Sequence, residues 1–180
     1  NTYDDSGRLV EGFGSAYVPN SYVLSLAAKH SELLPAVSIH PGRPDALDEL
    51  ERCLNGGAVM LKLLPNCQNV NYRDKRYLPF WRRMAAAGLP LLSHTGGEKT
   101  LPQWNAGFAN PALLETVLDC GVTVIAAHSG TRSFIDPDYF DVFAALLRRF
   151  PNLYGDISAL NHPVRIYGLA RLLREADLQE

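Results

Sequence analysis

The sequence lacks the features that mark secreted, membrane and disulfide-rich proteins. Its 180 residues include only three cysteines. Cys53, Cys67 and Cys120 have no short spacing and leave one over under any pairing, so we expect reduced thiols in a cytoplasmic protein. No apolar run approaches the roughly 18 residues of a membrane span, and no signal-peptide pattern is present. We therefore expect no membrane association.

Neither sign of charge is in large excess. The chain has 17 Lys and Arg against 19 Asp and Glu, which gives a net charge of −2 at pH 7 and argues against a nucleic-acid partner. Basic residues cluster over 73–83, but Asp74 and aromatic residues interrupt them, so we interpret this segment as a solvated helix face. No Gly-X-Gly-X-X-Gly or phosphate-loop motif follows an apolar run, which argues against a nucleotide-binding protein.

Two short apolar runs end in the same way. The run 89–93 precedes His-Thr-Gly at 94–96, and the run 122–127 precedes the similar motif His-Ser-Gly at 128–130. Parallel strands that are buried on both faces are apolar throughout, and polar residues at their carboxyl ends carry the chemistry of α/β folds. The repeated motif therefore predicts a site at one edge of a sheet.

Apolar runs and helical patterns alternate along the chain after a polar, glycine-containing loop over 1–19. We predict strands over 34–39, 58–64, 89–93, 122–127 and 153–157. We predict helices over 21–30, 44–54, 74–87, 111–120, 136–150 and 164–175. Strands that alternate with helices predict an α/β fold with a parallel sheet and right-handed crossovers. The long loop 95–110 is typical of an active-site lid.

One polar residue follows or ends each predicted strand. These residues are His40, Lys62, His94, His128 and Asp156. Because the carboxyl ends of parallel strands converge on one edge, they could share a site. Two histidines there suit a divalent metal such as Zn²⁺, which lowers the pKa of bound water toward about 7. Alternatively, one histidine binds the metal and the other transfers a proton.

Lys62 lies inside an apolar run, where an ammonium group is unfavourable unless it is paired or neutralised. Three interpretations stay open. It could contact a substrate carboxylate, bridge two metals as a carbamate, or form a salt bridge to a carboxylate such as Glu98.

The runs 57–65 and 89–96, together with 128–130, resemble the amidohydrolase superfamily. They are most similar to the branch that contains aminocarboxymuconate-semialdehyde decarboxylase, and the stretch 150–158 resembles the seventh strand of that branch. The likeness covers nearly the whole chain from about Tyr22 onward. It implies a (β/α)₈ TIM barrel with a divalent metal, Zn or alternatively Mn or Fe, at the carboxyl ends of the strands.

The resemblance implies a role for several residues. His94 would be a metal ligand, and His128 would be either a ligand or the catalytic histidine. Lys62 matches the strand-four lysine that is carbamylated in some binuclear members, so we count it as a candidate catalytic residue. Asp156 lies on the seventh strand rather than the eighth, and we assign it a supporting role beside the site instead of metal ligation.

Three further residues are candidates for substrate binding. Glu98 and Arg132 lie just beyond the two histidines, and the guanidinium of Arg132 suits a bidentate grip on a carboxylate. An exposed ion pair is the alternative for Arg132. His40 lies at a predicted strand end before a proline, where a plain loop role is the alternative.

The chain departs from the family in two places. The first-strand His-X-His pair and the strand-eight aspartate do not occur. Eight βα units need about 250 residues, whereas the five predicted here match strands three to seven. We interpret residues 1–180 as a single domain that is an incomplete barrel without the first strands and the last strand. Two explanations fit an incomplete barrel. The chain is either a fragment of a longer protein, which the start at Asn1 favours, or a truncated relative without metal chemistry.

These features together predict a metal-dependent hydrolase that cleaves C–N or C–O bonds of a small, carboxylate-bearing substrate. A non-oxidative decarboxylase of the same family is the first alternative. A non-catalytic α/β binding protein or degenerate barrel is the second. The expected partner is a small-molecule substrate, with no nucleic acid, and a homo-oligomer is left open.

Overall fold

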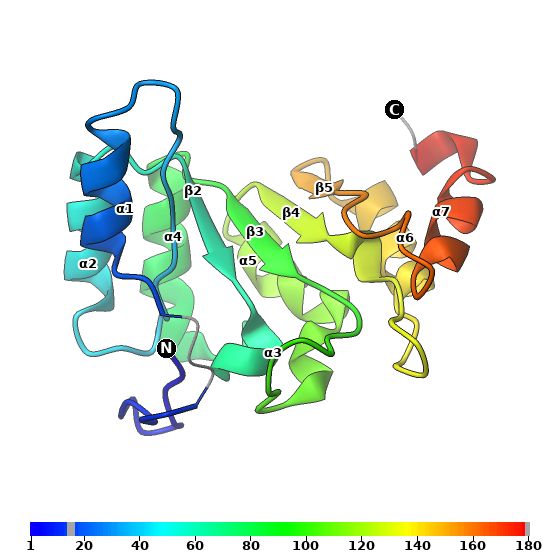
Figure 1. Cartoon of the computed structure of the whole chain (residues 1–180), viewed down its shortest axis with the longest axis horizontal. Coiled ribbons are helices and arrows are strands. Elements are labelled where there is room, and N and C mark those ends of the chain that lie inside the picture. The colour runs from blue at the N-terminus through cyan, green and yellow to red at the C-terminus, as the bar shows by residue number, and fades with distance from the viewer. Residues whose placement is uncertain (14–16, 179–180) are drawn as a thin grey trace.

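The computed structural model describes residues 1–13 and 17–178, and these form one parallel sheet of five strands. The strands are β1 (Ala36–Val37), β2 (Met60–Leu63), β3 (Leu91–His94), β4 (Val124–Ala127) and β5 (Leu153–Gly155). They lie side by side in the order in which they occur in the sequence, and every pairing is parallel (Figure 1). The predicted α/β fold is therefore confirmed.

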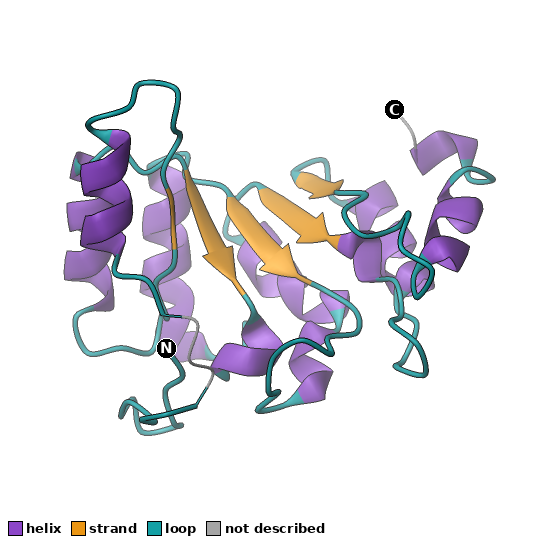
Figure 2. Cartoon of the chain, viewed as in Figure 1, coloured by secondary structure: helices purple, strands orange, loops and turns teal. Residues whose placement is uncertain are grey.

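Helices separate the strands, as the alternating pattern predicts (Figure 2). They are α1 (Asn20–Ala27), α2 (Ala46–Asn55), α3 (Pro65–Gln68), α4 (Leu78–Ala86), α5 (Glu115–Asp119), α6 (Phe140–Arg149) and α7 (Ile166–Leu172). Asp74 and Asn110 begin two of the helical segments, because their side chains accept hydrogen bonds from the amides of Arg76 and Ala112. No helix in the described part of the chain is long and apolar enough to cross a membrane.

Several boundaries differ from the prediction. α3 lies between the predicted strand 58–64 and the predicted helix 74–87, where no helix was predicted. α6 begins at Phe140 rather than near Asp136, because Asp138 accepts the hydrogen bond from the Phe140 amide while Asp136 pairs with Lys99 at 2.6 Å. The strands are also shorter than the apolar runs that contain them. Residues 14–16 of the predicted N-terminal loop lie outside the described residues.

One face of the sheet packs against helices and forms the core. Leu61, Leu91 and Val124 point to this face and are fully buried. They pack in one cluster with Trp81 of α4 and Phe143 of α6, and α4 and α5 lie behind the sheet in Figure 1. Burial of this apolar area is the main term that stabilises the fold.

The opposite face of the sheet is only partly covered. Its half-buried or exposed side chains are Ala36, Met60, Lys62, Leu92, Ile125 and Tyr154, and at the carboxyl ends of β3 and β4 the same face carries the buried residues His94 and Ala127. Four of them form one row across the sheet, because Lys62 pairs with Leu92, Leu92 with Ile125, and Ile125 with Tyr154. Lys62 is the one charged residue of this face, and it lies there beside apolar neighbours.

We expect replacement of Leu91 by alanine to lower the free energy of unfolding by about 2–5 kcal/mol, because it leaves a cavity behind the central strand. Leu34→Ala is the matched control, since Leu34 is 77% exposed, and its effect should stay within about 0.5 kcal/mol. Urea denaturation of both variants measures the difference. Equal losses would contradict the placement of the core behind β3.

Candidate active site

Two imidazole rings meet at the carboxyl edge of the sheet. His94 is the last residue of β3, and His128 directly follows β4. The ring centroids are 5.1 Å apart, and the ring planes meet at 72°. His94 is 3% exposed, and its Nε2 atom has no hydrogen-bond partner among the described residues. The structure thus brings together the two histidines of the repeated motif.

The hydroxyl residue after each histidine explains why the motif repeats. Thr95 Oγ1 donates to the carbonyl of Ala127 at 2.6 Å and accepts from the amide of Gly130 at 2.9 Å. Ser129 Oγ donates to the carbonyl of Asp156 at 2.8 Å. Each hydroxyl therefore ties the end of its own strand to the end of the next one.

The glycines of the motif are required by close approach and by backbone conformation. Gly96 and Gly130 have φ angles of +78° and +68°. A Cβ atom at Gly96 would overlap the carbonyl oxygen of Thr131. His128 and Ser129 also have positive φ angles, 64° and 51°, which cost about 1–3 kcal/mol each for residues other than glycine. The turn that carries His128 is therefore strained and held by its contacts.

Asp156 and Ser158 hold His128 from the next strand. Asp156 Oδ1 accepts from the amides of His128 and Ser158, both at 2.9 Å. Burial would raise the pKa of Asp156, but hydrogen bonds from Ser158 and from these amides lower it below its usual value. The carbonyl of Ser158 lies 2.9 Å from His128 Nδ1. Because a carbonyl only accepts, Nδ1 carries the proton and Nε2 presents a lone pair.

Burial favours the neutral form of both imidazoles. It lowers the pKa of His94 to about 4, and the charges of Lys62 and Arg165 act in the same direction. The pKa of His128 is also lowered, chiefly by burial, although its hydrogen bond to Ser158 opposes this. Neutral imidazole is the form that binds a metal or accepts a proton.

Two oppositely charged side chains lie near this pair. Burial lowers the pKa of Lys62, while the carboxylates of Asp156 and Glu98 oppose the shift. No carboxylate in the described part of the chain lies within 4.0 Å of the Lys62 ammonium. Glu98 Oε2 is 4.0 Å from His94 Nδ1, and Glu98 Oε1 accepts hydrogen bonds from the amide and hydroxyl of Thr100. Glu98 therefore borders the pair but also stabilises its own loop.

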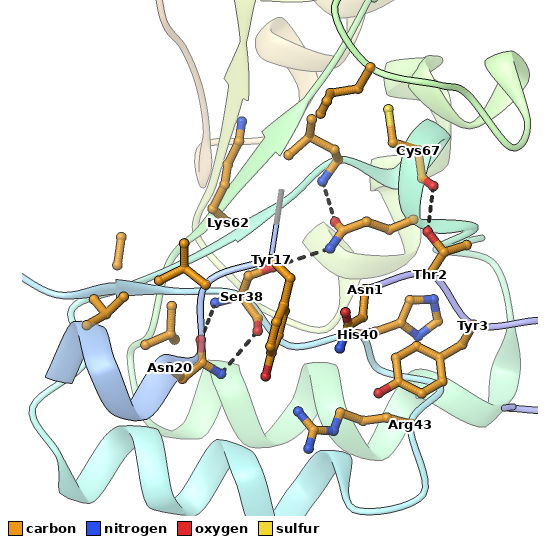
Figure 3. Close-up of a pocket in the computed structure, with 17 residues that line it drawn as sticks. Asn1, Thr2, Tyr3, Tyr17, Asn20, Ser38, His40, Arg43, Lys62 and Cys67 are labelled. Carbon is orange, nitrogen blue, oxygen red and sulfur yellow. Dashed lines mark hydrogen bonds between the residues drawn. The ribbon is translucent and has the colours of Figure 1, made fainter. Parts of the chain in front are cut away.

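A cavity of about 250 Å³ extends from Lys62 along β1 and β2 (Figure 3). Figure 3 shows Lys62 on one side and His40 and Arg43 on the other. His40 lines this cavity rather than the surroundings of His94. Its Nδ1 atom accepts from the amide of Gly42 at 2.9 Å, and its ring packs 4.9 Å from that of Tyr3.

Two arginines lie near the site, and only Arg132 was a candidate from the sequence. Arg132 is exposed, and its guanidinium lies over the ring of Tyr167, 5.5 Å from the centroid. Arg165, which sequence reasoning missed, is only 6% exposed and donates hydrogen bonds to the loops after β3 and β4. No sequence signal identifies it, because it stands in a segment with the pattern of a surface helix.

The predicted lid loop is anchored on α3. The amides of Trp104 and Asn105 both donate to the carbonyl of Asn66, at 2.8 and 3.0 Å. Trp104 stays 43% exposed and packs edge-on against Phe13. The missed helix α3 therefore positions the loop that follows β3.

The metal-ligating capacity of the described residues is limited to part of a site. Within residues 1–13 and 17–178, no group of three or more His, Cys, Asp or Glu side chains is placed to hold a metal ion. Two nitrogen atoms could ligate a metal ion. They are the unpartnered Nε2 atom of His94 and Nε2 of His128, which presents a lone pair. Catalytic zinc sites use three protein ligands, so these residues would supply two of them.

Comparison with known proteins gives one matching family model and several similar solved structures. The family model described as Amidohydrolase matches residues 4–178. A solved structure of a provisionally assigned 2-pyrone-4,6-dicarboxylic acid hydrolase from Pseudomonas putida is 16% identical, with a TM-score of 0.59 over 86% of this chain and 56% of that chain. Another, described as an amidohydrolase II, is 15% identical, with a TM-score of 0.52 over 84% of this chain and 58% of that chain. No curated protein matches.

The chain therefore spans a little over half the length of each of these two structures. At such low identity the likeness shows the fold, and the fold is that of part of a TIM-like α/β barrel. The five strands observed here are consistent in order and direction with consecutive strands of such a barrel.

We expect His40 to make the free energy of unfolding depend on pH. Burial lowers its pKa from 6.5 to about 4, so between these values the unfolded chain binds a proton that the folded chain does not. Stability is fully present above pH 6.5 and falls as the pH is lowered, by about 2 kcal/mol between pH 7 and 4.5 for this residue. His40→Asn keeps an acceptor for Gly42, and urea denaturation should show a smaller fall. Equal falls in both proteins would contradict the assignment.

Proposed function

Because the chain belongs to the amidohydrolase family, we propose that it forms part of a metal-dependent hydrolase that cleaves C–N or C–O bonds. The observation that carries this proposal is the pair of imidazoles at one sheet edge, where the buried Nε2 atom of His94 has no partner among the described residues and Nε2 of His128 presents a lone pair. A Zn²⁺ ion, or Mn²⁺ or Fe²⁺ in its place, would act there as a Lewis acid and as the source of a water with a lowered pKa.

The two histidines have different roles in this proposal. His94 binds the metal through Nε2, since this atom is buried and has no other partner among the described residues. His128 is either the second ligand or the group that accepts and returns a proton at Nε2. Asp156 fixes the backbone of His128, and Ser158 fixes its tautomer, so both are positioning residues.

Lys62 is proposed to bind a carboxylate of the substrate. Its ammonium has no ion-pair partner within 4.0 Å among the described residues, and Lys62 lines the cavity that His40 also lines. A substrate carboxylate would offset the cost of burying this charge. We retain Glu98, Arg132 and His40 as candidate substrate-binding residues, although only His40 lines this cavity and Arg132 is exposed outside it.

We propose further that additional βα units close the sheet into a barrel. The partly covered face with Lys62, Leu92 and Ile125 would then line the barrel interior, and the remaining metal ligands would come from those units. The partial coverage of the two structural neighbours supports this proposal. Such closure also removes the open edges of β1 and β5, which otherwise expose unpaired backbone groups.

A small substrate with carboxylate groups follows from the charge of Lys62 and agrees with the name of one neighbour. That neighbour is described as a hydrolase of a pyrone dicarboxylic acid, which makes 2-pyrone-4,6-dicarboxylate a suitable first probe. Hydrolysis of such a lactone cleaves a C–O bond. Release of CO₂ from a carboxylate probe instead would assign the protein to the decarboxylases of the family.

We expect the wild-type protein that includes the proposed additional βα units to bind Zn²⁺, and its His94→Ala variant to bind it at least about 100-fold more weakly. Loss of an outer-shell group alone costs about 10–100-fold in metal affinity, and loss of a ligand costs more. Isothermal titration of the metal-free protein measures this. His162→Ala, which replaces an exposed histidine outside the pair, is the matched control and should bind as the wild type does.

The same proteins then test the reaction. Zinc-dependent ring opening of 2-pyrone-4,6-dicarboxylate, lost in His94→Ala and retained in His162→Ala, would support a hydrolase with this substrate class. Zinc binding that is equal in all three proteins would refute the role of His94. Binding of the dicarboxylate without any turnover in the zinc-loaded wild type would favour the non-catalytic alternative.

A further inference from the structure

Arg165 joins the two loops that carry the histidines. It lies at the start of α7 and is 6% exposed. One terminal nitrogen donates to the carbonyl and hydroxyl of Thr131, at 2.6 and 3.2 Å, and the other donates to the carbonyl of Gly97. No carboxylate in the described ranges lies within ion-pair distance of it. Its guanidinium is therefore used to bridge backbone groups rather than to pair with an acid.

The two loops and α7 are closely packed around Thr131. A Cβ atom at Gly97 would overlap the side chain of Asp136, and one at Gly168 would overlap the side chain of Thr131. The Gly97 amide also donates to the carbonyl of Thr131 at 3.4 Å. The two loops and α7 thus meet at van der Waals contact around the guanidinium.

Gly97 stands three residues after His94, and Thr131 stands three residues after His128. A bridge between these points adds to the strand pairing and to the hydrogen bonds of Thr95, and it joins the two loops beyond the histidines. We infer that Arg165 is a positioning residue that holds His94 and His128 at the spacing that metal binding requires. This inference rests on the proposed metal-dependent function.

The direction in which metal affinity changes when Arg165 is removed distinguishes a positioning role from an effect of its charge. The guanidinium lies close enough for its charge to lower the pKa of both histidines. If Arg165 acted only through this charge, its removal would strengthen the binding of a cation. If Arg165 positions the loops, its removal weakens binding although a repulsive charge is gone.

The test uses Arg165→Gln, Arg165→Lys and the matched control Arg171→Gln. Arg171 belongs to the same helix, but it pairs with Asp138 and Asp141 instead of the histidine loops. Titration with Zn²⁺ alone measures affinity, and amide hydrogen exchange over 95–99 and 129–133 measures loop opening. We expect a loss of about 10–100-fold in affinity for both Arg165 variants, with faster exchange in both loops. Arg171→Gln should match the wild type in both measurements.

Arg165→Lys keeps the charge but not the forked geometry of the guanidinium. It therefore tests the positioning role of Arg165 if the glutamine variant does not fold. Zinc affinity that is unchanged or higher in the Arg165 variants, while the wild type binds zinc, would overturn the inference. Absence of zinc binding in the wild type would instead refute the proposed function. Faster exchange confined to the Arg165 variants would then still support the bridge between the loops.

Discussion

The candidate site depends on hydrogen bonds that join the carboxyl end of each strand to that of the next. Thr95 connects the end of β3 to Ala127 and Gly130, and Asp156 connects the end of β5 to the backbone of His128. These contacts hold the His128 turn in a left-handed conformation that costs about 1–3 kcal/mol per residue without glycine. The strain is tolerable because the core behind the neighbouring strands fixes them. The strained turn carries the imidazole of His128, which lies 5.1 Å from that of His94.

The surroundings of the two imidazoles explain how a cation and an anion could be bound side by side. Burial and the nearby cations Lys62 and Arg165 keep the histidines neutral, so their lone pairs are free. The same cations would repel a metal, and the carboxylates of Glu98 and Asp156 oppose this repulsion. Lys62 is the cation without a close partner among the described residues, which suits an anionic substrate, whereas Arg165 is fully engaged by backbone groups.

Much of the fold and the centre of the site could be predicted from the sequence. Apolar runs and caps such as Asn110 are local signals, and His94 and His128 were predicted to meet because parallel strands converge. Strand lengths were overestimated, because apolar residues continue past the last ladder hydrogen bond. α3 is too short to have a helical period. Arg165 could not be found, since its partners are backbone carbonyls of loops whose meeting depends on three-dimensional packing.

The central claim is that His94 and His128 together face one metal ion. X-ray absorption spectroscopy of the zinc-loaded protein tests this most directly, because the imidazole ring gives a characteristic scattering pattern. Our account predicts that His94 contributes one imidazole to the zinc shell of the wild-type protein, and that His128 contributes a second if it is a ligand, so the shell of His94→Ala loses an imidazole. A zinc shell without any imidazole would contradict the account.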